Sequence, residues 1–254
     1  MPIIIKSDDE IAIMRCAGSI VARTLHKLEQ ELRPGLVVRE LDKTVRREFE
    51  RHRVIPTFLG YPPGGEVPYP ATVCVSVNEE IVHGIPGKRV LREGDVVSLD
   101  LGCTYRGFVA DSAVTTVVGT GSPDARRLVD VTREALAEGI RHARAGHRLG
   151  EISHAIQTYV EAQGFGVVRE YVGHGVGRQM HEEPQVPNFG PPDHGPVLKK
   201  GMVLALEPMV TVGDWHTRQL EDRWTVVTAD GSLAAHFEHT IAVTEGDPVI
   251  LTVP

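Results

Sequence analysis

The sequence predicts an α+β fold, a mostly antiparallel sheet with helices on one face. Three observations predict it: four segments carry apolar residues at helical spacing, β-branched runs alternate with them, and the helical segments come in two pairs, each followed by strands. The chain has 254 residues, enough for a sizeable core. We expect one domain over residues 1–254.

Composition and charge narrow the class of protein. The formal net charge of −7 argues against a nucleic-acid partner held through a basic patch. No apolar run approaches the ~20 residues of a membrane span, and the start MPIIIKSDDE lacks a signal-peptide pattern. Cys16, Cys74 and Cys103 have no CxxC spacing, so we expect free thiols and a cytoplasmic protein.

The first half begins with a pair of helices. A capping box at Ser7 and Glu10 opens the first helix, and Pro34-Gly35 ends it. The second covers about residues 37–53, and its basic side chains either form an anion patch or interleave with acids on a solvated face. Residues 58–70 are a loop by composition. Strands are expected over residues 72–77 and in a hairpin over 96–118.

Each arm of that hairpin carries one aspartate among apolar neighbours. If the turn is centred between Tyr105 and Arg106, Asp100 lies directly opposite Asp111. Facing carboxylates repel each other, and a cation between them would reverse the effect. Two unrelated aspartates at strand ends are the alternative.

The second half repeats the order of the first. Ser122 and Pro123 open a third helix, and a fourth covers about residues 149–163 and stops at Gly164. Residues 32–54 align without gaps with residues 143–165. This repeat predicts two related halves, about 1–120 and 121–254, packed around a pseudo-two-fold axis. Further strands are expected over residues 167–172, 203–207, 225–228 and 236–243.

Three more polar residues join the two aspartates as candidates for chemistry. His174 is flanked by glycines in a segment, residues 171–190, that reads as a loop, and Glu207 and Glu238 lie in apolar strands. Each acid alone has a plain alternative, a salt-bridged core carboxylate. Together, four carboxylates balance two divalent cations. The oxygen-rich donor set suits Mn, Fe or Co, with Zn as a further option.

Several motifs follow one another along nearly the whole chain: IIIKSDDEIAIMRCAG, NEEIVHGIP, the Asp-x10-Asp hairpin, GHGVGRQMHEEP, LALEPMV and FEHTIAVT. With these motifs the sequence resembles the type I methionine aminopeptidases of the pita-bread metallopeptidase superfamily. The resemblance implies that Asp100 binds one metal ion, that His174 and Glu207 bind a second, and that Asp111 and Glu238 bridge the two.

The resemblance also implies the reaction. The initiator methionine would be removed from nascent polypeptides whose second residue is small. A metal-bridged hydroxide would attack the scissile carbonyl, with Glu207 as proton shuttle. His83 and His181 would contact the substrate or the tetrahedral intermediate. The family task implies a location near the ribosome, and we expect a monomer.

A methionine pocket is implied at Tyr69, Cys74, Met180 and Trp224, with ordinary core as the alternative for each. Two features depart from the family pattern. Family members often have an aromatic residue in place of Met180, and the loop over residues 58–70 is longer than in some bacterial relatives. Both departures concern the rim of the pocket.

Two other functions are open. An Xaa-Pro peptidase of the same fold would carry a large extra N-terminal domain, whereas the first helix here starts at residue 7. The long helical insertion of type II enzymes is also missing between Glu207 and Glu238. An inactive binding module would have lost metal ligands, whereas this chain keeps five ligands and two histidines.

Overall fold

A nine-stranded sheet forms the centre of the computed structural model, which describes residues 2–62 and 67–254. The helices are α1 (Asp8–Glu31), α2 (Arg39–His52), α3 (Pro123–His142) and α4 (Leu149–Ala162). The strands are β1 (Ile55–Pro56), β2 (Cys74–Val77), β3 (Glu80–Val82), β4 (Val96–Tyr105), β5 (Phe108–Val117), β6 (Gly166–Val167), β7 (Gly173–Gly175), β8 (Glu182–Val186), β9 (Val203–Leu206), β10 (Met209–Thr211), β11 (Thr217–Gln219), β12 (Val226–Thr228), β13 (Ala234–His236), β14 (Glu238–Ala242) and β15 (Val249–Ile250).

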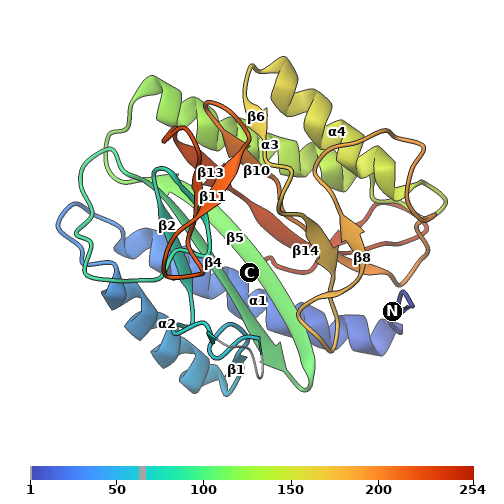
Figure 1. The fold of residues 1–254 in the computed structure, drawn as a ribbon. Helices are drawn as coiled ribbons and strands as arrows, with labels where there is room; N and C mark the ends of the chain where they lie inside the picture. The colour runs from blue at the N-terminus through green and yellow to red at the C-terminus, as the bar shows by residue number, and fades with distance from the viewer. Residues whose placement is uncertain (1, 63–66) are drawn as a thin grey trace.

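Antiparallel pairing joins these strands throughout the described residues. The large sheet has the order β1-β4-β5-β14-β9-β7-β8, with β2 added to β4 and β15 to β14, and two three-stranded sheets flank it. Figure 1 shows α1 crossing behind β4 and β5. The predicted α+β class is confirmed.

Local sequence signals place the helix ends. The hydroxyl of Ser7 accepts a hydrogen bond from the Glu10 amide (3.2 Å), and the Glu10 carboxylate accepts one from the Ser7 amide (3.0 Å), so the capping box is confirmed. Helix α1 ends at Glu31, shortly before the predicted stop. Gly164 follows α4 with a left-handed φ of 78°, as predicted for a helix-ending glycine.

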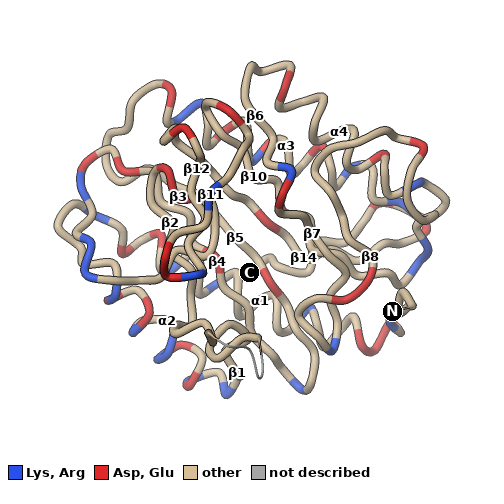
Figure 2. The backbone as a smooth tube through the Cα atoms, viewed as in Figure 1, with Lys and Arg blue, Asp and Glu red and all other residues tan. Residues whose placement is uncertain are grey.

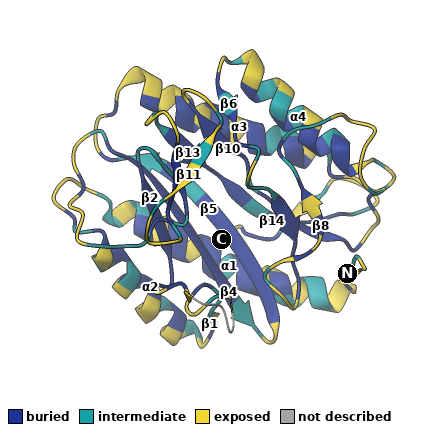
Figure 3. Cartoon of the chain, in the orientation of Figure 1, coloured by how far each residue is buried: buried dark blue, intermediate teal, exposed yellow. Residues whose placement is uncertain are grey.

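The alternation of side chains along the strands separates a helix-facing side of the sheet from an open side. Val97, Leu99 and Leu101 of β4 pack with α1 and α2 in one apolar core. Leu204 and Leu206 of β9 pack with α3 and α4 in another. Helices therefore cover one face, as predicted, and the inner strands are buried (Figure 3). Each pair of helices has its own core, while the pseudo-two-fold relation between the halves stays a prediction.

The register of the central hairpin differs from the prediction. Asp100 pairs with Ala113, and Asp111 pairs with Gly102, so the two aspartates are diagonal neighbours and not directly opposite each other. The reason is the turn. Arg106 and Gly107 have φ values of 48° and 81°, which form a two-residue turn one position later than predicted. The pairing moves by two positions in total, which keeps both carboxylates on the same face.

Other strand predictions need smaller corrections. The segment 167–172 is a strand only at its start, because β6 ends at Val167, and the predicted loop around His174 contains strands β7 and β8. The strand predicted over 236–243 is interrupted at Phe237, between β13 and β14. Within the predicted loop 58–70, residues 63–66 lie outside the described residues.

Basic and acidic residues are mixed along the chain. In Figure 2, basic and acidic residues alternate along α2 and the outer loops. Arg46 pairs with Asp42 (2.7 Å) and Arg51 with Glu48 (3.9 Å), which favours the solvated-face interpretation of α2. A search of the described helices finds none that combines the length and the apolar character needed to span a bilayer.

Candidate active site

Strand register brings the acidic residues together on the open face of the sheet. Ala113 of β5 pairs on one side with Asp100 of β4 and on the other with Glu238 of β14, so these three side chains point to one face. Asp111 lies two residues before Ala113 on β5 and shares that face. Glu207 directly follows β9, where the register with β14, extended by one residue, places it opposite Glu238.

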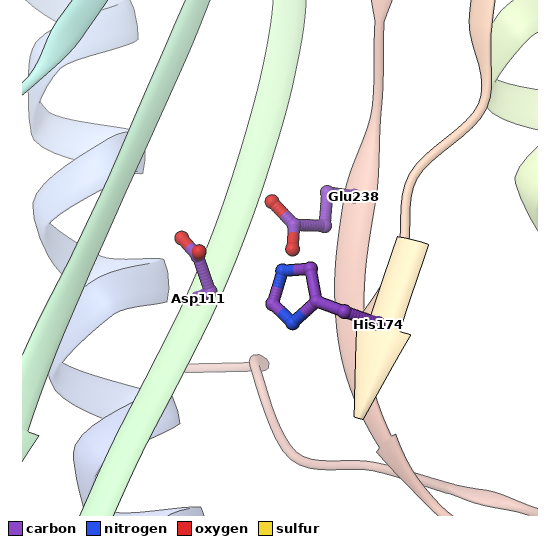
Figure 4. Close-up of side chains that lie close together, drawn as sticks. All are labelled: Asp111, His174 and Glu238. Carbon is purple, nitrogen blue, oxygen red and sulfur yellow. The ribbon is translucent and has the colours of Figure 1, made fainter. Parts of the chain in front are cut away.

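A buried cluster of possible ligands forms at this point. Asp111, His174 and Glu238 each offer a ligand atom, and these atoms all lie within 4.8 Å of one another. Figure 4 shows the three side chains converging from β5, β7 and β14. Glu207 joins them, since its Oε1 lies 3.5 Å from His174 Nε2. Four separate segments of the chain thus supply one cluster.

The four carboxyl groups share an unfavourable environment for charge. Burial raises the pKa of Asp111 to about 7. Burial and the neighbouring acids raise the pKa values of Asp100, Glu207 and Glu238 well above their ordinary range. Among the described residues, one oxygen of each of Asp100, Asp111 and Glu238 is buried without a hydrogen-bond partner. Unpaired buried oxygens carry a cost that bound cations remove, so these residues fit a divalent metal centre.

His174 is held in the form that binds metal. Its Nδ1 atom lies 2.9 Å from the carbonyl oxygen of Gly175, which can only accept, so Nδ1 carries the proton. Nε2 therefore presents a lone pair toward Glu207. Burial and the nearby His181 lower the pKa of His174 to about 3, so the ring is neutral near pH 7. Strand β7 pairs with both β8 and β9 and fixes this geometry.

A cavity of about 160 Å³ opens beside the cluster. It is lined by every residue that the sequence nominated: His83, His181, Glu207, Asp100, Asp111, His174, Glu238, Tyr69, Cys74, Met180 and Trp224. The structure adds five lining residues that the sequence analysis missed: Phe58, Tyr61, Val82, Tyr171 and Val172. Two groups of lining residues stand out. We call the four acids the carboxylate wall: Asp100, Asp111, Glu207 and Glu238. We call the ring and sulfur side chains the aromatic wall: Phe58, Tyr69, Cys74, Met180 and Trp224.

Two histidines stand between the walls as neutral hydrogen-bonding groups. Burial and the neighbouring His181 lower the pKa of His83 to about 4, and burial lowers the pKa of His181. The hydroxyl of Tyr61 lies 2.5 Å from His181 Nδ1. If Tyr61 donates this hydrogen bond, Nε2 of His181 carries the proton and is a donor. The rings of His174 and His181 are 4.3 Å apart, so His181 lies next to the ligand cluster.

The aromatic wall combines a buried and a half-buried part. Phe58, Tyr69 and Cys74 belong to one buried apolar cluster, and Met180 and Trp224 pack against it. The Tyr69 ring lies edge-on to Trp224, with centroids 5.2 Å apart. Cys74 is paired with Asp100 across β2 and β4, so it joins this wall to the carboxylates. Burial raises the pKa of the Cys74 thiol, which keeps it protonated and apolar in character.

Comparison with known proteins shows the family to which the chain belongs. The sequence pattern of metallopeptidase family M24 matches residues 12–245. The chain belongs to metallopeptidase family M24. This M24 chain is 53% identical over 250 residues to methionine aminopeptidase 1 of Bacillus subtilis, covering 98% of this chain and 99% of that protein. The resemblance to methionine aminopeptidases drawn from the motifs is thus confirmed.

Solved structures agree with the M24 fold. The methionine aminopeptidase of Thermotoga maritima superposes with a TM-score of 0.96 at 50% identity, over the full length of both chains. A prolidase of Pyrococcus furiosus gives a TM-score of 0.80 at 23% identity, covering 99% of this chain and 66% of the prolidase chain. The second match shows a shared fold alone.

The missed residues of the M24 cavity had weak sequence signals. Phe58 and Tyr61 lie in a loop whose Gly and Pro content predicts no fixed position. Tyr171 is the first residue of the segment that contains the glycine-flanked His174, and this nearness was its one usable hint. His236 is also missed: it is buried, and its Nε2 lies 4.0 Å from Glu207 Oε2. The spacing His-x-Glu in HFEH could have marked it.

Proposed function

We propose that this M24 chain is a methionine aminopeptidase that removes the initiator methionine from nascent polypeptides whose second residue is small. The observation that carries the proposal is the cavity itself, where a carboxylate–histidine cluster faces an apolar wall of aromatic and sulfur side chains. The high identity to curated methionine aminopeptidases over the full chain supports the same reaction.

In this proposal Asp100, Asp111, His174, Glu207 and Glu238 hold two divalent ions. Their oxygen-rich donor set suits Mn, Fe or Co, with Zn as a further option. Asp111 and Glu238 would be shared between the two ions. When bound, such ions polarise a carbonyl group and lower the pKa of a metal-bound water to about 7. The four buried carboxylates then face four positive charges.

Glu207 would move the proton. Burial and the nearby Asp111 raise the pKa of Glu207, which favours its carboxyl group as a proton acceptor. It would take the proton of the attacking water and give it to the leaving amine. Its place at the end of β9, beside Pro208, leaves its carboxyl group at the edge of the cavity.

His83 and His181 would stabilise charge that develops on the substrate. Both rings are neutral near pH 7 because their pKa values are lowered, so each offers one N–H group to the scissile amide or the oxyanion. His83 is held between the rings of Tyr171 and Trp224, at centroid distances of 5.9 and 6.1 Å. A fixed donor loses little on reorganisation during the reaction.

The aromatic wall would bind the methionine side chain. Tyr69, Cys74, Met180 and Trp224 present sulfur and ring edges, which are favourable surroundings for a thioether. The α-amino group of the substrate would lie near Asp100, which restricts cleavage to the first residue. We place the enzyme in the cytoplasm as a monomer that meets nascent chains near the ribosome.

A peptide panel tests the proposal against an Xaa-Pro peptidase, which shares the fold. The purified chain is loaded with Mn²⁺ or Co²⁺ and assayed on Met-Gly-x, Leu-Gly-x and x-Pro peptides. We expect release of methionine from Met-Gly-x and little cleavage of the other two. Preferred cleavage of the x-Pro peptides would overturn the assignment, and no cleavage of any peptide by the metal-loaded chain would favour a binding module.

A further inference from the structure

A buried ion pair lies outside the cavity lining, and its acidic partner directly follows the cavity-lining His181 in sequence. Lys6 Nζ lies 2.7 Å from Glu182 Oε2, although the two residues are 176 positions apart in sequence. Their side chains are 3% and 5% exposed. The Lys6 ammonium also donates to the Ile4 carbonyl (3.1 Å), and the Lys6 amide donates to the Gly201 carbonyl (2.8 Å). The segment that precedes α1 is therefore anchored at Lys6.

The second oxygen of Glu182 closes a turn in its own segment. Glu182 Oε1 accepts hydrogen bonds from the amides of Arg178 (2.8 Å) and Gln179 (3.2 Å). One carboxylate thus binds the start of the turn with one oxygen and Lys6 with the other. Met180 and His181 lie between these amides and Glu182, so the turn determines where both side chains project.

Gly177 makes room for this arrangement. A Cβ atom at Gly177 would lie 2.5 Å from Glu182 Oε1 and 2.5 Å from Lys6 Cε, too close for any side chain. The carbonyl of Gly177 accepts a hydrogen bond from the Val109 amide (2.7 Å), which ties the turn to β5. The turn is therefore attached both to the strand that carries Asp111 and to the segment before α1.

The turn carries two residues of the proposed substrate site, Met180 and His181. Met180 packs against the aromatic wall, and His181 lies against His174 and Tyr61. His181 is exposed to solvent on one side, while its ring lies against His174 and Tyr61 on the other. The backbone of the turn sets the position of His181. This position matters for the rate, because a misplacement of about 1 Å can lower the rate by a factor of about 10².

We propose that the Lys6–Glu182 ion pair is a positioning device for His181 and Met180, through which the segment before α1 completes the active site. Neither residue lines the cavity. Removal of one partner leaves the other charge buried without its counter-ion, which favours a rearrangement of the turn that brings that charge to water. The inference rests on the proposed aminopeptidase function.

The test compares Lys6→Met and Glu182→Gln with the wild-type chain, all loaded with Mn²⁺. Bound metal, thermal unfolding temperature, kcat and KM for a Met-Ala-Ser peptide are measured for each. We expect kcat to fall at least tenfold at unchanged metal content, and the double variant to lose little more than either single variant. Lys6→Arg, which keeps the charge, should restore most of the rate. Lys43→Met, at an exposed lysine paired with Glu40, is the matched control and should be unchanged.

The outcomes separate the two proposals. If the wild-type chain does not release methionine, the proposed function fails. If the wild type is active and the folded variants keep kcat within twofold, the positioning role is wrong, even where the unfolding temperature falls. Loss of bound metal in the variants would also overturn it, since the pair would then act on the metal centre. Should Lys6→Met fail to fold, Glu182→Gln, which is isosteric, and Lys6→Arg carry the same comparison.

Discussion

The two walls of the cavity are built in different ways. The carboxylate wall stands on β4, β5 and β14, where the strand register fixes each side chain. The aromatic wall comes mainly from loops and turns, including the segments around Tyr61, Met180 and Trp224. In the proposed function, the chemistry would therefore rest on the sheet, and the choice of substrate would rest on loops.

The largest effect is expected on the carboxylate wall. Glu207→Ala should lower turnover of Met-Ala-Ser by about 10³-fold or more in Mn²⁺-replete buffer, because a ligand and the proton shuttle are lost together. Methionine release measures the rate. Glu134→Ala, at an exposed glutamate on α3, is the control. Full activity of Glu207→Ala would remove this residue from the mechanism.

A smaller effect is expected between the two walls. His181→Ala should lower kcat by about 10²-fold, since one donor to the developing charge is lost, while bound metal stays unchanged. Metal analysis and kinetics on the same sample check both parts. His194→Ala, at a histidine whose side chain is 72% exposed, is the matched control. Unchanged kinetics for His181→Ala would refute its role.

A substitution in the aromatic wall should lower the specificity constant kcat/KM for methionine peptides. Trp224→Ala should lower kcat/KM for Met-Ala-Ser by about tenfold through lost contact with the methionine side chain, with metal content unchanged. The chain's other tryptophan supplies the control, because Trp215 stacks on His216 away from the cavity. If Trp224→Ala loses metal instead, the two walls are not independent and the comparison fails.

Proton release on metal binding is the smallest effect. The raised pKa of Asp111, about 7, means that its carboxyl group carries a proton below pH 7 in the metal-free chain, and a metal must displace that proton. The proton on Asp111 should therefore make binding release more protons at pH 6 than at pH 8, and metal affinity should rise with pH over this range. His174, with a pKa of about 3, adds nothing there. Calorimetry in buffers of different ionisation enthalpy measures the release, and a pH-independent value would contradict the account.

Alternation along the strands was the most useful sequence signal for the carboxylate wall. It placed Asp100 and Asp111 on one face of the hairpin, while Glu207 and Glu238 were added because four carboxylates balance two divalent cations. The hairpin turn was misplaced by one position, yet the error cancelled for the face, because the pairing moved by an even number of residues.

The aromatic wall was harder to predict from residue patterns. Tyr69, Cys74, Met180 and Trp224 came from the family resemblance, while Phe58, Tyr61 and Tyr171 were missed. Loop residues carry no period that fixes where they point. The buried Lys6–Glu182 pair joins residues 176 positions apart, and neither segment alone indicates the contact.

The proposed reaction requires five side chains, distant in sequence, to hold two divalent ions. The most direct test is a crystal structure of the chain grown with excess Mn²⁺, with anomalous scattering measured at the manganese edge. We expect two anomalous peaks, with Asp111 and Glu238 touching both, Asp100 touching one, and His174 and Glu207 touching the other. An empty cluster, or manganese bound only elsewhere, would contradict it.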